Sequence, residues 1–445
     1  MAKVPNEGLQ RLFDETNWTL SQCARQINLV GAENGTPLRT NASAVHHWLR
    51  GTNPQKETVR RCILEALSRR LQRPVTHTEA GFPSPVARSS NPTDTVEGMI
   101  ELGRADMDPS RRAVLGAGLF SVALTIPGWQ DVIGRTEAVQ TGRALRVGMN
   151  EVEMVIAMTE RISDLDDQFG GRHARPMAAT FMINTVAPYL RADASDKVHK
   201  AMLSAASDLA YLTGYMAVDE GLHGLAQRYY VKALELAGAA DDHLTYCTTL
   251  RGMSVQAVDL RHGRKAMELA DAAAAASPKA GPRMLAFLAG QQAHAAAQTG
   301  DRTNALRRLR EAESAMERAE SRSRAFGSYD PSSLLYHASQ VRYGLGDVAG
   351  SIEAMQQSDQ HRFGVYRRAR VRHRATLAER QLQVGHLEAA CATWHLALDD
   401  FPMVQSGRAD DRIKTMGGLI RPHLKNSTAR ELYERARGVA PALVA

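Results

Sequence analysis

The residues of this sequence with the clearest chemical potential are basic and lie close together near the N-terminus. Between residues 39 and 73, eight arginines and lysines face only Glu57 and Glu65, so this segment holds +6 of the chain's formal net charge of +7. Such a cluster indicates an anionic partner, although a charge run on a helix is also typical of a solvated face. The eight basic residues are Arg39, Arg50, Lys56, Arg60, Arg61, Arg69, Arg70 and Arg73.

Four short helices are predicted to position these side chains. The spacing of apolar residues places the helices over residues 6–16, 19–28, 41–50 and 57–70. A turn of about ten residues separates the second helix from the third, and its sequence reads LVGAENGTPLRT. The four helices together predict a small all-α domain that ends near residue 83.

The third helix has well-defined signals at both ends. Thr40 or Asn41 can cap its N-terminus, and Gly51 ends it. Its inner stripe is apolar, whereas its outer face is polar and basic. The inner stripe consists of Val45, Trp48 and Leu49, and the outer face of Ser43, His46, His47 and Arg50.

This layout resembles the helix-turn-helix domain of phage-repressor-like (XRE-type) regulators, above all in the stretch SAVHHWLRGTNP. The following segment LSRRLQRPVTHTEAG is similar to one found in actinobacterial transcriptional regulators that carry a tetratricopeptide-like region behind such a domain. One departure is the turn before the third helix, which is longer than the three or four residues of the usual motif.

The resemblance implies double-stranded DNA as a partner, with the third helix in the major groove. Ser43, His46, His47 and Arg50 would then reach base edges, and the Arg50 fork could take a guanine. A second set would contact phosphates, which give affinity without reading sequence. This second set is Arg39, Lys56, Arg60 and Arg61.

The C-terminal part contains a degenerate repeat in which two small residues stand seven positions apart on one helix face. The five pairs are Ala226/Ala233, Ala266/Ala273, Ala305/Ala312, Ser351/Ser358 and Ala390/Ala397. A turn glycine precedes each pair, namely Gly221, Gly263, Gly300, Gly346 and Gly385. Small residues let two helices approach closely, and glycine ends the first of them in a left-handed conformation. The repeat therefore predicts stacked helical hairpins.

These segments, with GLHGLAQRYYVKALELA and GDRTNALRRLREAE among them, resemble tetratricopeptide repeats. The predicted fold is all-α: a helix-turn-helix domain at 1–83, a linker rich in Pro and Ser at 84–110 and a tetratricopeptide-like α-solenoid at 111–445. Residues 110–127 look like a twin-arginine export signal. Because their apolar part is shorter than the about 20 residues that span a bilayer, we interpret them as a buried helix and expect no membrane association.

Side chains for a ligand are harder to identify in the solenoid. A groove that binds a peptide would use aromatic and amide groups, here Asn184, Tyr211, Tyr215, Tyr229 and Gln256, although aromatics at helical spacing more often pack between helices. A second basic run, YRRARVRHRATLAER, suits DNA backbone, an acidic peptide or an acidic metabolite. On a solenoid helix, such a run is more typical of solvated surface.

Other classes of function find no support in the sequence. Four scattered cysteines form no metal or redox motif and are expected to be reduced and buried, as in a cytoplasmic protein. The first ten residues lack the apolar core of a signal peptide. We find no phosphate-binding glycine loop and no hydrolase or zinc-protease motif, so we expect no enzyme, no cofactor and no metal site, the pair His46 and His47 included.

The sequence therefore favours a cytoplasmic, sequence-specific DNA-binding transcriptional regulator. Its solenoid would form a homodimer and sense a peptide or small-molecule effector, as in the similar peptide-sensing regulators of Gram-positive bacteria. The alternative is a tetratricopeptide scaffold for protein–protein interactions, whose N-terminal module docks without binding DNA. The charge of +6 in one segment favours the regulator, because a docking surface does not need it.

Overall fold

The structure is a computed structural model that describes residues 5–33, 37–71, 75–83, 95–107, 146–276, 280–319 and 329–444. Within these ranges all named elements are helices, and the single β-bridge, Arg146 to Asp193, is isolated. The prediction of an all-α protein is confirmed. The run at 110–127 and the basic residue Arg73 lie outside the described residues.

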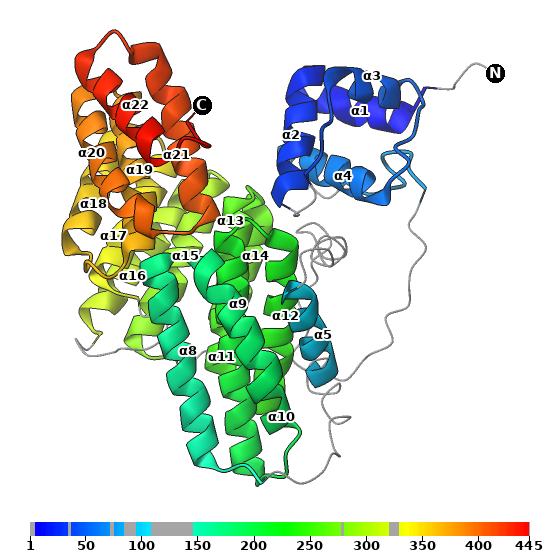
Figure 1. The fold of residues 1–445 in the computed structure, drawn as a ribbon, viewed down its shortest axis with the longest axis vertical. Helices are drawn as coiled ribbons and strands as arrows, with labels where there is room; N and C mark the ends of the chain where they lie inside the picture. The colour runs from blue at the N-terminus through cyan, green and yellow to red at the C-terminus, as the bar shows by residue number, and fades with distance from the viewer. Residues whose placement is uncertain are drawn as a thin grey trace.

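Four helices form the N-terminal module (Figure 1). They are α1 (Glu7–Thr16), α2 (Leu20–Glu33), α3 (Ala42–Leu49) and α4 (Glu57–Leu71). Three of them match the predicted ranges closely, but α2 continues five residues past the predicted end at residue 28 because Val30 and Gly31 are buried. The connection between α2 and α3 is correspondingly shorter than the sequence suggested.

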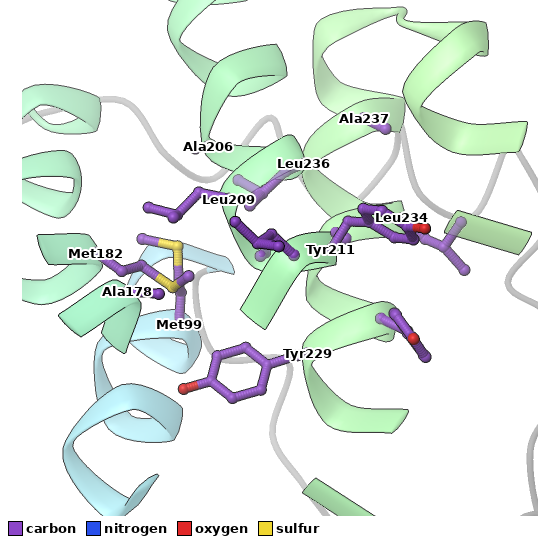
Figure 2. Packing of buried hydrophobic residues seen from close by; sticks show 14 of the residues in the cluster. Met99, Ala178, Met182, Ala206, Leu209, Tyr211, Tyr229, Leu234, Leu236 and Ala237 are labelled. Atoms are coloured by element: carbon purple, nitrogen blue, oxygen red, sulfur yellow. The ribbon is translucent and has the colours of Figure 1, made fainter. Parts of the chain in front are cut away.

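The predicted linker at 84–110 contains a packed helix, α5 (Thr95–Met107). Val96 and Met99 are almost completely buried in the large core of the C-terminal part, and Met99 lies beside Met182 in Figure 2. The hydroxyl of Tyr229 donates to Asp106 of α5 at 2.9 Å. Residues 95–107 therefore pack with the helices of the C-terminal part and do not form part of a linker.

The C-terminal part is an array of helices, most of them in antiparallel pairs (Figure 1). It begins with α8 (Met149–Phe169), α9 (Gly171–Phe181), the π-helix η3 (Met182–Val186) and α10 (Ala187–Leu190). Three pairs follow: α11 (Asp196–Asp219) with α12 (His223–Ala240), α13 (His243–Asp259) with α14 (Gly263–Ala276), and α15 (Pro282–Gln298) with α16 (Arg302–Glu317). Three more pairs are α17 (Pro331–Gly344) with α18 (Val348–His361), α19 (Arg367–Gln383) with α20 (Leu387–Asp400), and α21 (Gly407–Ile420) with α22 (Ser427–Val439). Short 3-10 turns, η4 (Phe401–Met403) and η5 (Arg421–His423), lie next to α21.

The repeat predicted from small residues is confirmed at the level of packing. All ten alanines and serines of the five pairs have no exposed surface. Where the first helix of a pair carries serine, its hydroxyl donates to the backbone oxygen of the small residue: Ser254 to Ala266 at 2.7 Å and Ser339 to Ser351 at 2.6 Å. Such bonds require helices in close contact, which only small side chains permit.

The turn inside the second pair differs from its prediction. In the other four pairs a glycine with φ between 77° and 87° lies five positions before the first small residue. In the α13–α14 turn that position is Arg261, with φ of 62°, and Gly263 already belongs to α14. Gly263 is therefore not the turn residue, and an arginine occupies a conformation that residues other than glycine normally avoid.

The array closes on itself instead of ending as an open curve. Gln405, next to α21, accepts a backbone hydrogen bond from Arg172 and donates one to Phe169, so the C-terminal helices contact the first ones. Gly170 has φ of 91° at this junction, and a Cβ atom there would lie 2.4 Å from the Gln405 oxygen. The contact between the last helices and the first ones thus requires glycine at position 170, which is not part of the predicted repeat.

The N-terminal module docks on the array through α4. All residues from 62 to 68 are buried, although the module's own core can cover only one side of a helix. On the other side, a carboxylate oxygen of Glu65 lies 2.9 Å from Nε2 of His262, in the α13–α14 turn. Arg69 connects Glu65 with Glu33 of α2, at 2.9 and 2.6 Å. A line of buried charges therefore joins the two parts.

Two further predictions concern the whole chain. The four cysteines are unpaired and buried, and burial raises the pKa of Cys23 to about 12, so this thiol is unreactive. None of the described helices is long and apolar enough to cross a membrane.

Candidate nucleic-acid interface

The third helix of the module, α3, is fixed at both ends. The side chain of Asn41 caps it by accepting from the backbone of Ala44 at 2.9 Å. At the other end Gly51, with φ of 91°, turns the chain away. Val45 and Leu49 anchor the inner side of α3 in the module core. One face of α3 is therefore free to meet a partner.

That outer face carries the four residues predicted to read bases. Ser43, His46, His47 and Arg50 are all exposed. The rings of His46 and His47 stand edge to face, 6.0 Å apart. In the part of the chain that the structure describes, no hydrogen bond or ion pair occupies any of these four side chains. They present donors and one guanidinium fork to solvent.

The connection from α2 to α3 holds α3 against α2 in spite of its length. The side chain of Asn28 donates to the backbone oxygen of Thr40 at 2.8 Å and accepts from the Thr40 backbone at 2.8 Å. Such a double hydrogen bond to one residue fixes the end of the connection just before the Asn41 cap. The unusually long turn therefore does not leave α3 loosely placed.

The four residues predicted to contact phosphates separate into two kinds. Arg39 and Lys56 are exposed, and no carboxylate among the described residues pairs with either. Arg60 instead folds back on the α3–α4 loop, where its Nε donates to the Pro54 oxygen at 2.8 Å. Arg61 donates to Glu57 at 3.0 Å. Arg39 and Lys56 are thus better placed than Arg60 to meet an anionic partner, since Arg60 mainly shapes the loop.

The remaining charges of the segment are partly used within the protein. Arg69 lies in the buried line of charges described above, and Arg70 donates to the backbone oxygen of Thr16 at 2.9 Å. Glu57 is shared by both neighbouring arginines and by His77. The positive potential therefore concentrates around α3, since the basic residues of α4 have partners.

One exposed cation was missed by the sequence reasoning. Arg25 lies on the outer side of α2, and no carboxylate in the described ranges pairs with it. In a helix-turn-helix the helix before the recognition helix crosses the DNA backbone, which makes Arg25 a third phosphate candidate. Its position opposite the buried Cys23, Ala24 and Ile27 of α2 was a signal that the helical periodicity already contained.

The predicted ligand residues of the solenoid mostly serve the core. Tyr229 and Tyr211 are buried, and so is Gln256, whose amide donates to the His223 backbone oxygen at 2.8 Å. The Tyr211 hydroxyl accepts from Arg251 at 2.8 Å. These three residues therefore serve as packing and hydrogen-bonding groups in this structure, and their burial does not favour a peptide-binding role, which stays a prediction.

Asn184 and Tyr215 remain partly accessible but do not belong to one site. Asn184 is exposed on η3, and no hydrogen bond or ring contact connects it with the tyrosines. The guanidinium of Arg368 lies 5.2 Å from the Tyr215 ring. Burial alone would raise the pKa of Tyr215. The nearby arginines outweigh this effect, so the pKa of Tyr215 lies below its ordinary value.

The second basic run, on α19, is built into the protein. Arg368 is buried and binds Asp166, Asp167 and Asp219 of α8 and α11 at 2.9 to 3.5 Å. Arg374 pairs with Asp359 at 3.0 Å. For these residues the interpretation as solvated surface was wrong, because carboxylates from other helices pair with them, and those of Arg368 lie far away in the sequence.

No metal centre is evident. Among the described residues there is no group of three or more His, Cys, Asp or Glu side chains that could hold a metal ion.

One family matches part of the chain. Its description is the SP15 N-terminal domain, and the match covers residues 9–83, from α1 to the end of the module. The array behind the module lies outside this match. No curated protein matches the chain.

Proposed function

We propose that this protein is a sequence-specific, DNA-binding transcriptional regulator. The observation that carries the proposal is the outer face of α3, where four polar side chains are exposed without partners while Val45 and Leu49 fix the helix from behind. A rigid helix with free donors is what reading of the major groove requires.

The array would contribute dimerisation and sensing. One helix as short as α3 contacts few base pairs, so specific binding favours two copies on a two-fold operator. A peptide or small-molecule effector bound to the array would alter DNA binding only if it binds two arrangements of the module unequally. The contact of Glu65 with His262 supports such coupling, because it joins the module to the array at one turn.

The experiment is genome-wide footprinting of the tagged, full-length protein, followed by binding of the purified protein to the enriched fragments. We expect a small set of sites with two half-sites, and binding that weakens steeply as salt rises. Uniform coverage of the genome, or no preference of the purified protein for any fragment at moderate salt, would contradict the proposal.

The second candidate function is a scaffold for protein–protein interactions. One observation favours it: α4 is buried against the array, as expected of a module whose task is to dock. In that case a stoichiometric protein partner would co-purify with the chain and no DNA would be enriched. Removal of the α3 face by Ser43→Ala together with Arg50→Ala would then leave the partner's binding unchanged.

A further inference from the structure

The interior of the array also contains arginines that take no part in the ion pairs of α19. Three of them, Arg362, Arg372 and Arg380, come from α19 and the end of α18, and all three interact electrostatically with Tyr336 of α17. His373 stacks on the Tyr336 ring, with centroids 4.2 Å apart and planes 11° apart. We call the three arginines together with His373 the inner cationic cluster.

None of the three arginines has a carboxylate within ion-pair distance among the described residues. The acids around them are used elsewhere. Asp359 pairs with Arg374 at 3.0 Å, Glu379 with Arg412 at 2.7 Å, and Asp259 with Arg408. Asp330 caps α17 by accepting from Ser333 at 2.7 Å.

Several nitrogen atoms in the cluster lack a hydrogen-bond partner among the described residues. They are Nε of Arg362, Nε of Arg380 and Nδ1 of His373, all shielded from solvent. In the described part of the chain, the Arg362 side chain is held only by a long bond from its Nη2 to the Ser358 hydroxyl, at 3.4 Å. The guanidinium of Arg372, which is half-buried, makes no hydrogen bond within the described residues. Unused N–H groups on arginines indicate a missing acceptor.

The neighbouring imidazoles do not add further charge. Burial, with the arginines reinforcing it, lowers the pKa of His373 well below its ordinary value. Burial likewise lowers the pKa of Arg380 to about 10. The cations of the cluster, which have no directly paired carboxylate among the described residues, thus lie in a partly desolvated place, where an anion would interact more strongly than in water.

We propose that the inner cationic cluster binds an anionic group, a carboxylate or a phosphate, with Arg362 and Arg372 as direct ligands and Tyr336 and His373 beside them. Arg380 is held by Ser339 at 2.6 Å and Gln340 at 2.7 Å and contributes charge from a fixed position. The chemistry fits because planar guanidinium forks bind both groups through paired hydrogen bonds. This proposal rests on the proposed function in one respect only: the bound anion would be the signal that the array senses.

The test is calorimetric titration of the purified full-length protein with citrate and, separately, with pyrophosphate, at constant ionic strength set with chloride. We expect saturable binding of one probe, and the stronger probe distinguishes a carboxylate site from a phosphate site. Arg372→Gln should weaken that binding by about tenfold or more. Arg310→Gln is the matched control, because Arg310 is exposed on α16 and donates only to its own helix. Binding of neither probe at millimolar concentration, or equal binding by the wild type and Arg372→Gln, would overturn the proposal.

A second measurement separates a binding site from a structural role. Without a probe, Arg372→Gln should raise the melting temperature, because it removes a charge that has no partner in the folded protein. A lower melting temperature would show instead that Arg372 supports the fold. Neither measurement contains DNA, so their failure leaves the DNA-binding proposal intact, and a failed footprint leaves the anion site intact.

Discussion

The two arginine-rich regions of this protein are alike in sequence but differ in which of their arginines have carboxylate partners. Around α3, Arg39, Arg50 and Lys56 are exposed and face no carboxylate in the described ranges. On α19, Arg368 and Arg370 are bound by aspartates from other helices. Charge density therefore does not distinguish a surface for an anionic partner from an internal support. The presence or absence of carboxylate partners makes that distinction.

The largest effect is expected at Arg368. Removing this side chain by Arg368→Ala leaves three aspartates without their cation in the core, which should lower the free energy of unfolding by about 3–5 kcal/mol. Chemical denaturation monitored by circular dichroism measures this change. Arg367→Ala is the control, because Arg367 is the next residue and forms no ion pair in the described part of the chain. If both variants unfold alike, α19 is not held by this network.

The acid Asp208 offers the reverse case, a carboxylate that pairs with no cation among the residues the structure describes. Burial and Asp242 raise its pKa to about 7, whereas in the unfolded chain it titrates near 4. The folded protein thus holds a proton that the unfolded chain releases, and this contribution to stability is present at low pH and lost as pH rises from about 4 to 7.

Asp208→Asn should accordingly raise the melting temperature at pH 8 more than at pH 5. Thermal unfolding at both pH values measures the difference. The exposed Asp164 serves as control, and Asp164→Asn should give no such dependence. An equal shift at both pH values would mean that Asp208 is already ionised in the folded protein.

On the exposed side, Arg50→Ala should leave the melting temperature unchanged and weaken specific DNA binding by about 1–3 kcal/mol. Fluorescence anisotropy with a footprinted site and with the same site altered at one base pair measures both affinity and selectivity. We expect the variant to lose its preference at one position. A uniform loss on all sequences would assign Arg50 to a phosphate instead.

A smaller effect separates Lys56 from Arg61. Lys56 is exposed without a carboxylate partner in the described ranges, whereas Arg61 donates to Glu57. Lys56→Ala should reduce the slope of log affinity against log salt by about 1. Arg61→Ala should change this slope less, because the charge of Arg61 is already partly neutralised. The opposite order would show that Glu57 releases Arg61 when DNA binds.

Much of the fold was predictable because it depends on spacing within single helices. The Asn41 cap, the inner residues of α3 and the ten small residues of the repeat are properties of short segments. The partners of Arg368 were not predictable, since Asp166 and Asp219 lie about 200 and 150 positions away in the sequence. The exposed residues of α3 were identified correctly, but only the structure separates Arg39 and Lys56 from Arg60.

Neighbouring helices account for the burial of the predicted ligand residues. Tyr211 of α11 accepts from Arg251 of α13 and lies against Tyr230 of α12. The amide of Gln256 on α13 donates to the backbone oxygen of His223 on α12. An aromatic or amide group on a stacked helix is therefore weak evidence of a ligand, because contacts between hairpins can occupy it.

The smallest predicted effect concerns Arg261, which has φ of 62° where four other turns have glycine. Arg261→Gly should stabilise the protein by about 1 kcal/mol or less, because relief of the left-handed strain exceeds the entropy that glycine loses on folding. Thermal unfolding measures this gain. The reverse change, Gly346→Arg, should destabilise the protein, because Gly346 has φ of 87°, which arginine adopts only with strain. Open space surrounds its Cβ position, so a steric clash would not contribute to the loss. If Arg261→Gly lowers stability instead, the Arg261 side chain itself supports the turn whose His262 contacts Glu65 of the N-terminal module. The strained Arg261 would then have a role in holding the N-terminal module on the array.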